Sequence, residues 1–191
     1  MESQADVWLS RILAETPWKQ HRIHMFGREI LVPRLIAWYG DTGTHYAWSG
    51  APMQLLPWTG LLLEIRACIE KACPGKLFNS VLLNQYRDGQ DSVSWHADDE
   101  PELGPSPFIA SLSLGHARDF LLKPKPKPKA RVKAQPGPEP KRRSYVLSHG
   151  SLLLMGEGTQ EDYLHCLPKR PGRVVASPRV NLTFRHTSLR D

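Results

Sequence analysis

At 191 residues, the chain is long enough for one domain with a core of its own and too short for two ordinary domains, so we expect a single domain over residues 1–191. Hydrophobic residues make up 40% of the sequence, a fraction that excludes an intrinsically disordered chain. The formal net charge of +6 suits a polyanionic partner, although such a surplus is also common in proteins that are merely soluble.

The cysteines and the N-terminal residues indicate the compartment. Cys68, Cys73 and Cys166 include no CxxC pair, so neither a disulfide framework nor a structural zinc site is indicated. The start, MESQADVWLSRILAE, has no apolar leader core, and no run approaches about 18 apolar residues. We expect a soluble, intracellular protein without a membrane span, cytoplasmic in a bacterium and nuclear in a eukaryote.

The first part of the chain predicts two helices separated by a hairpin. Apolar positions within residues 7–13 indicate a short helix that Pro17 ends. Two alternating apolar runs within residues 22–34 meet at Gly27, a pattern typical of a β-hairpin. Residues 57–73 carry an apolar stripe at helical spacing and predict a second, amphipathic helix.

The remainder is rich in short β-segments. They are bounded by Gly, Pro, Asp or Asn, and in chain order they read NSVLLNQY, VSWH, PFIASLSLG, DFLL, SYVLS, GSLLLM, YLHCL and RVNLTFRH. Many closely spaced short strands after a helix predict an antiparallel double sheet. We therefore expect a mainly β fold with flanking helices, an α+β jelly roll, in preference to a doubly wound fold.

One segment departs from this pattern. Residues 123–143, KPKPKPKARVKAQPGPEPKRR, are nearly all Lys, Arg, Pro, Gly and Glu and predict an exposed, flexible loop. The loop is either a solvated linker or a cationic arm for phosphates, because clustered Lys and Arg bind polyanions by releasing counterions.

WHADDE, residues 95–100, places one histidine beside three carboxylates. On a strand, His96 and Asp98 would leave the same face and could hold one ion. A second imidazole would complete the two-His-one-carboxylate triad of non-haem Fe(II) oxygenases. Among eight histidines, His165 lies in the strand-like YLHCL and is the best third ligand. A single HxD pattern is weak evidence for a metal site, and the alternative is a charged turn without a ligand.

A candidate anion pocket strengthens this hypothesis. Alternate positions of RVNLTFR put four polar side chains on one strand face: Arg179, Asn181, Thr183 and Arg185. Inward-pointing arginines need anionic partners, and a dicarboxylate would satisfy both. Asn84 and Tyr86 of LLNQY also share a face and could donate to the same acid. Alternatively, the arginines pair with the acids of WHADDE and no ligand exists.

Four motifs in order, LLNQYRDG, WHADDE, HGSLLLM with YLHCLP, and PRVNLTFR, resemble the AlkB family of Fe(II)- and 2-oxoglutarate-dependent nucleic-acid dealkylases. The resemblance covers roughly residues 26–186 and is greatest to members that repair alkylated duplex DNA. It implies a double-stranded β-helix in which His96, Asp98 and His165 hold Fe(II). It also implies that 2-oxoglutarate and O2 are co-substrates.

The resemblance assigns 2-oxoglutarate binding to five residues: Asn84, Tyr86, Arg179, Asn181 and Arg185. Arg185 and Asn181 would lie near the C1 carboxylate, and Arg179 with Tyr86 near the distal carboxylate. Asn84 would support the same ligand. Which arginine meets which carboxylate stays open at this point.

Substrate binding is implied for a nucleotide-recognition lid, about residues 22–56, and for the acids that follow the metal ligands. The implied residues are Phe26, Arg28, Tyr46, Trp48, Ser49, Asp99 and Glu100. Phe26 resembles a wedge inserted into the base stack, and Trp48 resembles an aromatic that stacks on a flipped base. Alternatively, Phe26 packs on the body, Trp48 belongs to the core, and the two acids are solvated or pair with an arginine.

The implied activity is oxidative demethylation of N1-methyladenine and N3-methylcytosine in DNA, with release of formaldehyde, succinate and CO2. Duplex DNA is favoured because of the wedge, single-stranded DNA remains possible, and a monomer is expected. Two alternatives stay open. The same chemistry could act on methylated RNA or protein, or the chain could be an inactive nucleic-acid binding module.

Overall fold

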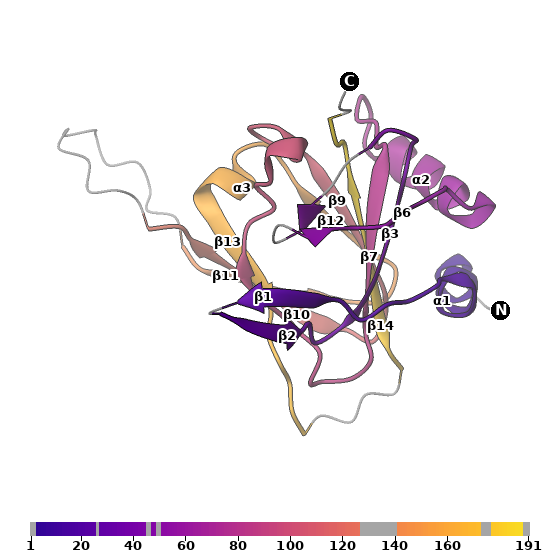
Figure 1. Ribbon diagram of the computed structural model, residues 1–191. Coiled ribbons are helices and arrows are strands. Elements are labelled where there is room, and N and C mark those ends of the chain that lie inside the picture. Colours follow the sequence, from indigo (N-terminus) through magenta and orange to yellow (C-terminus); the bar gives the residue numbers. More distant parts are fainter. Residues whose placement is uncertain are drawn as a thin grey trace.

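The computed structural model describes residues 3–25, 27–44, 47–48, 51–126, 141–172 and 177–188, with the backbone alone for residues 23–25, 47–48 and 51–52. Its main body consists of two β-sheets that enclose a polar cavity, and two helices cover the outer side of the larger sheet (Figure 1). The expected jelly-roll architecture is confirmed.

The larger sheet has six strands in the order β12-β9-β14-β7-β3-β6. Their bounds are β3 Leu35–Gly40, β6 Leu55–Leu56, β7 Ser80–Tyr86, β9 Ile109–Gly115, β12 Ser151–Met155 and β14 Arg179–Arg185. All pairs are antiparallel except β3 with β6. Strand β14 lies between β7 and β9 and is buried along its whole length, which fixes its register on both sides.

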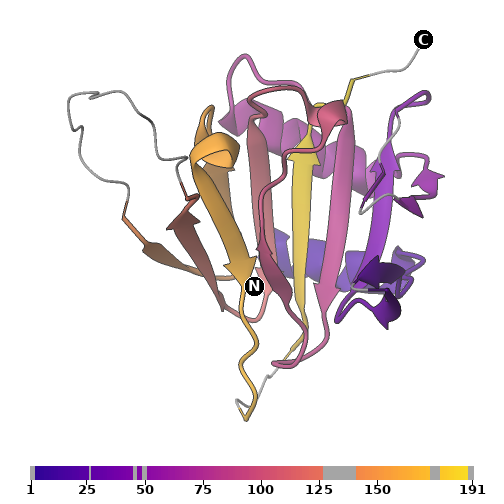
Figure 2. The same cartoon turned by 60° about the vertical axis from the view of Figure 1, so that its left-hand side comes forward.

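The smaller sheet has four antiparallel strands in the order β11-β10-β13-β8 (Figure 2). Their bounds are β8 Val93–His96, β10 Arg118–Pro124, β11 Arg143–Leu147 and β13 Tyr163–Leu167. Two short pairs stand apart from both sheets, β1 Arg22–Met25 with β2 Arg28–Leu31 and β4 Ala47–Trp48 with β5 Ala51–Pro52. A 3-10 turn, Pro101–Leu103, follows the WHADDE segment, and a one-turn helix, α3 Thr159–Asp162, precedes β13.

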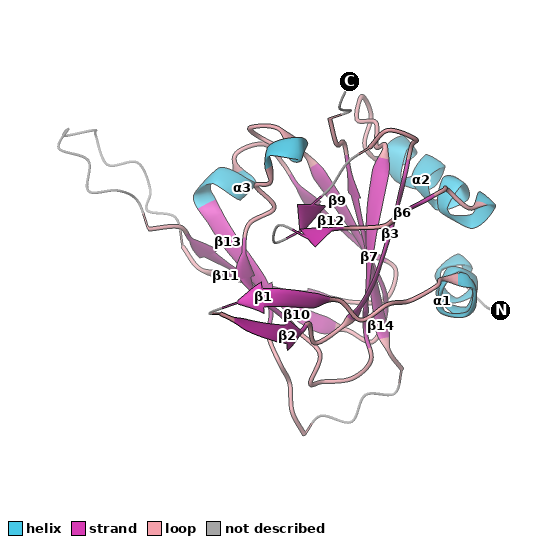
Figure 3. Cartoon of the chain, viewed as in Figure 1, coloured by secondary structure: helices cyan, strands magenta, loops and turns pink. Residues whose placement is uncertain are grey.

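Helices α1 Gln4–Glu15 and α2 Gly60–Ala72 lie side by side on the outer face of the six-stranded sheet (Figure 3). Ser3 and Thr59 cap their N-termini by accepting backbone N–H groups. Apolar side chains of both helices, including Ile65, pack with Phe184 of β14 in the main core. In the part of the chain that the structure describes, no helix is both long and apolar enough to cross a bilayer.

Most predicted elements are confirmed, with shifted ends. The second helix begins at Gly60 because Thr59 forms its cap. Strand β3 was not predicted. The predicted loop over residues 123–143 is wrong at both ends, since β10 continues through Pro124 and β11 begins at Arg143, and its central residues 127–140 lie outside the described residues. The extension of β10 is supported by pairing with Tyr163 and Leu164 of β13.

Gly115 ends β9 opposite Arg179 of β14 and has a φ of +84°. A Cβ here would collide with the carbonyl oxygen of Pro178. We expect Gly115→Ala to lower the free energy of unfolding by about 2 kcal/mol or more, since strained backbone alone costs roughly 1–3 kcal/mol. Thermal denaturation checks this. Gly75→Ala is the matched control, because its φ of +77° is similar and no atom lies within 4 Å; equal losses would contradict the collision.

Candidate metal centre and anion pocket

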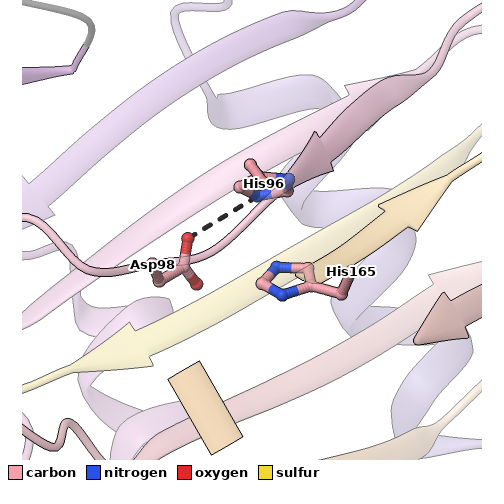
Figure 4. A group of neighbouring side chains, drawn as sticks. All are labelled: His96, Asp98 and His165. Atoms are coloured by element: carbon pink, nitrogen blue, oxygen red, sulfur yellow. Dashed lines mark ion pairs between the residues drawn. The ribbon is translucent and has the colours of Figure 1, made fainter. Parts of the chain in front are cut away.

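Three metal-ligating side chains meet between the two sheets. His96 ends β8, and His165 lies directly opposite it on β13, with 4.2 Å between the ring centroids. One ligand atom from each of His96, Asp98 and His165 lies within 4.8 Å of the others, and the three side chains point toward one another (Figure 4). The predicted proximity of these residues is confirmed.

The predicted reason for this proximity is partly wrong. Strand β8 ends at His96, so Asp98 lies in the connection that follows and does not share a strand face with the histidine. The carboxylate instead turns back toward the histidines, where Asp98 Oδ1 lies 2.9 Å from Arg185 Nη2 and 3.7 Å from His96 Nε2. The ion pair between Asp98 and Arg185 matches the alternative prediction that an arginine of RVNLTFR pairs with an acid of WHADDE.

Burial and charge set the protonation states of two of these residues, Asp98 and His165. Burial alone would raise the pKa of Asp98, but the Arg185 guanidinium and then the two imidazoles lower it to about 2. Burial lowers the pKa of His165 to about 4. At neutral pH Asp98 is therefore ionised and His165 is neutral, and these are the forms that bind divalent metals.

The cavity beside these ligands contains all six polar residues predicted on β7 and β14. They are Asn84, Tyr86, Arg179, Asn181, Thr183 and Arg185. The alternation predicted for RVNLTFR is confirmed, because every second residue from Arg179 to Arg185 lines this cavity. The candidate metal ligands and the side chains predicted to bind an anion therefore line one partly open cavity.

Arg179 lies at the other end of β14 from Arg185 and is 2% exposed. Its Nη2 donates to Ser113 Oγ at 2.9 Å, and its guanidinium lies 5.2 Å from the centre of the Tyr86 ring. No carboxylate of the described residues is within 4.0 Å of it, and burial lowers its pKa to about 10. A buried guanidinium without a carboxylate partner in this part of the chain fits an acidic ligand.

The side-chain amides of Asn181 and Asn84 both form hydrogen bonds within the protein. Asn181 donates from Nδ2 to Ser111 Oγ and to the Leu112 carbonyl oxygen, at 2.8 and 3.0 Å. Asn84 Oδ1 accepts from Arg34 Nε at 2.7 Å. Arg34 is buried, lines the same cavity and was missed by sequence reasoning, because its place after the hairpin gives no sign of burial.

The residues proposed for substrate binding are only partly placed. Phe26, Tyr46 and Ser49 lie outside the described residues, and Trp48 is described only as a backbone position that pairs with Ala51. Arg28 is exposed at the start of β2. The predicted β1–β2 hairpin is confirmed.

The two acids after the metal ligands differ in environment. Asp99 is exposed and forms a 2.8 Å ion pair with Lys125, which follows β10. Glu100 is half-buried, and its carbonyl oxygen accepts from the Leu103 backbone at the 3-10 turn. Asp99 therefore faces solvent beside the candidate metal centre, next to Lys125 of the predicted basic segment.

A family model described as the 2OG-Fe(II) oxygenase superfamily matches residues 1–185. The chain belongs to this superfamily. Membership implies Fe(II), with 2-oxoglutarate and O2 as co-substrates, and the His-Asp-His group is able to hold the ion. The buried Arg179 and the two-His-one-carboxylate donor set both fit these groups.

Relatives of similar sequence confirm the resemblance to the AlkB family. The chain is 41% identical over 183 residues to "DNA oxidative demethylase ALKBH2" of Arabidopsis thaliana, covering 88% of this chain and 58% of the relative. It is 42% identical over 186 residues to "Alpha-ketoglutarate-dependent dioxygenase alkB homolog 3" of Rattus norvegicus, covering 95% and 59%. The chain thus spans less than two thirds of these relatives.

A solved structure supports the fold. The structure of OsALKBH1 superimposes with a TM-score of 0.57 at 18% sequence identity, covering 96% of this chain and 92% of that chain. At this identity the likeness concerns the fold alone.

Proposed function

We propose that the protein is a dioxygenase that oxidatively demethylates N1-methyladenine and N3-methylcytosine in DNA, a direct-reversal repair reaction. The observation that carries the proposal is the His96-Asp98-His165 group, which opens into a cavity containing the buried Arg179. Relatives named DNA oxidative demethylase support the substrate class. Bound Fe(II), with 2-oxoglutarate and O2, supplies the oxidising chemistry that releases formaldehyde, succinate and CO2.

In this proposal, His96, Asp98 and His165 would hold Fe(II). Arg185 would bind the C1 carboxylate of 2-oxoglutarate, because it lies beside Asp98 at the metal end of the cavity. Arg179 would bind the distal carboxylate, because it lies at the far end of the same strand.

Three polar side chains complete the proposed co-substrate site. Tyr86 lies under the Arg179 guanidinium and would support the distal carboxylate with it. Asn84 has its oxygen held by Arg34, which leaves the amide N–H groups as its donors. Asn181 has both amide protons engaged by β9, so its contribution would be to brace β14 or to exchange these bonds for a carboxylate.

The proposed substrate side lies at residues 22–56 and at the acids after Asp98. Asp99 is solvent-accessible next to the metal ligands, where a carboxylate favours a cationic methylated base, and Glu100 would be its partner. Trp48, with Tyr46 and Ser49, would receive the flipped base. We propose further that residues 1–191 act as one monomeric domain in the compartment that holds the DNA.

The test supplies the Fe(II)-loaded protein with O2, 2-oxoglutarate and matched single- and double-stranded oligonucleotides carrying one N1-methyladenine. Mass spectrometry reads demethylation and succinate together. Demethylation of DNA is the expected result. Succinate without demethylation would overturn the proposed DNA substrate and leave the oxygenase activity standing. An RNA oligonucleotide of the same sequence would then test whether methylated RNA is the substrate. Neither product, with iron bound, would overturn the active site.

Phe26 carries the proposed duplex preference. Because a wedge offsets part of the few kcal/mol of unstacking, we expect Phe26→Ala to slow duplex demethylation about 10-fold while single-stranded turnover is unchanged. Rates on the two matched substrates measure this. Leu31→Ala is the control, since Leu31 is an exposed apolar residue of the same hairpin, away from its tip. Equal losses on both substrates would contradict the wedge.

A further inference from the structure

Gln160 is a polar side chain that the proposed chemistry does not use, although it is only 2% exposed. It lies on α3, the single turn between β12 and β13. Its Oε1 accepts from the backbone N–H of Asp98 at 3.0 Å, and its Nε2 donates to Met155 Sδ at 3.4 Å. Because a backbone N–H can only donate, the amide oxygen must face Asp98, and the orientation of the Gln160 amide is fixed.

The backbone of Asp98 depends on the hydrogen bond to Gln160, whereas the backbones of the other two candidate ligands are held by strand pairing. His96 and His165 sit on strands and are aligned by the β8–β13 pairing. Asp98 follows the end of β8, so no strand ladder holds its backbone. Asp98 is 3% exposed. If its buried N–H lost the acceptor, the folded state would be destabilised by the full desolvation penalty of that group.

The turn that carries Gln160 is itself fixed on both sides. Ser106 Oγ accepts from the Gly158 backbone N–H at 2.9 Å, and the Asp162 carbonyl oxygen accepts from the Lys125 backbone N–H at 2.8 Å. Strand β13, with His165, begins directly after α3. The Gln160 side chain therefore links the backbone of Asp98 to the element that places His165.

We propose that Gln160 is a positioning residue of the metal centre. Its amide oxygen holds the Asp98 backbone so that the carboxylate faces both imidazoles, and the link to α3 fixes the Asp98–His165 separation. This inference rests on the proposed metal centre and extends it by a residue that touches no ligand atom. Partners that orient metal ligands in this way typically contribute about 10–100-fold in metal affinity.

The first measurement is Mn(II) binding by EPR, without DNA, 2-oxoglutarate or O2. Gln160→Met keeps the length of the side chain and removes the acceptor, so we expect its Mn(II) Kd to rise about 10–100-fold. Gln160→Glu keeps an acceptor oxygen in either protonation state, so it should bind Mn(II) no more weakly than wild type. Glu161→Gln, an exposed change on the same turn, is the control. Circular dichroism confirms that each variant is folded at the assay temperature.

The second measurement is hydrogen exchange at the Asp98 amide in the metal-free protein. We expect slow exchange in wild type, compared with the exposed Asp99, and faster exchange in Gln160→Met. Wild-type Mn(II) affinity in a folded Gln160→Met variant would overturn the inference. If that variant does not fold, unprotected exchange at Asp98 in wild type would overturn it equally. Failure of wild type to bind Mn(II), with Asp98 protected, would overturn the proposed metal centre and leave the Gln160–Asp98 contact standing.

Discussion

Asp98→Ala is expected to abolish both metal binding and 2-oxoglutarate turnover. The substitution removes the carboxylate of the His96-Asp98-His165 group, and two imidazoles alone hold Fe(II) far more weakly than a complete triad. It also removes the acid that lies 2.9 Å from Arg185. Succinate formation should fall to the background of the iron-free protein, and Mn(II) titration should show no saturable site.

A matched variant separates this effect from loss of an ordinary ion pair. Asp119→Ala also removes an aspartate that pairs with an arginine, since Asp119 Oδ2 lies 2.7 Å from Arg170 Nη2. Asp119 is not among the residues that line the cavity. We expect this variant to keep wild-type metal affinity and turnover. Succinate formation by Asp98→Ala at a rate near that of the control would show that Asp98 is not a metal ligand.

Arg179→Met is expected to raise the KM for 2-oxoglutarate by at least about 30-fold, because losing one partner of a buried charge pair costs about 2–5 kcal/mol. Burial already disfavours the charged guanidinium, as its lowered pKa indicates. The neutral, similarly long methionine should therefore leave the melting temperature of the ligand-free protein unchanged or raised. Titrating 2-oxoglutarate against initial rates of succinate formation, with melting curves alongside, measures both effects.

The control for this prediction is Arg170→Met, which removes an arginine outside the cavity. We expect its KM for 2-oxoglutarate to match wild type. Mn(II) affinity should be unchanged in both variants, because Arg179 lies at the opposite end of β14 from the metal ligands. A wild-type KM in Arg179→Met would mean that the distal carboxylate binds elsewhere.

The strands could be predicted where their side chains alternate or where turn residues bound them. Strand β14 is the clearest case, since alternate polar residues in RVNLTFR marked the cavity face. Strand β3, LIAWYG, was missed because it is buried on both faces and so shows no alternation. The single turn of α3 was missed because GTQED has the composition of a loop, and one turn leaves no helical period to detect.

The candidate site could be predicted where the residue type itself indicates a chemical role. His96 and Asp98 were found because imidazole and carboxylate groups bind metal ions, and the two arginines of β14 were found because charged side chains at inward positions of a strand are unusual. Gln160 could not be found in this way, since a glutamine in a polar stretch is ordinary until its burial is known. The Asp98–Arg185 pair was foreseen only as an alternative to ligand binding, whereas the cavity leaves room for both roles.

The division of the site between the two sheets has a consequence for the lifetime of the protein. His96 and His165 belong to the four-stranded sheet, while Arg179 and Arg185 belong to the six-stranded sheet. Iron and 2-oxoglutarate bound between them would cross-link the two sheets, and a ligand at 100 times its Kd stabilises the folded state by about 2.7 kcal/mol. The resistance of the protein to proteolysis would then rise and fall with the supply of iron and of 2-oxoglutarate. A shortage of either would lower the amount of the protein as well as stop its catalysis.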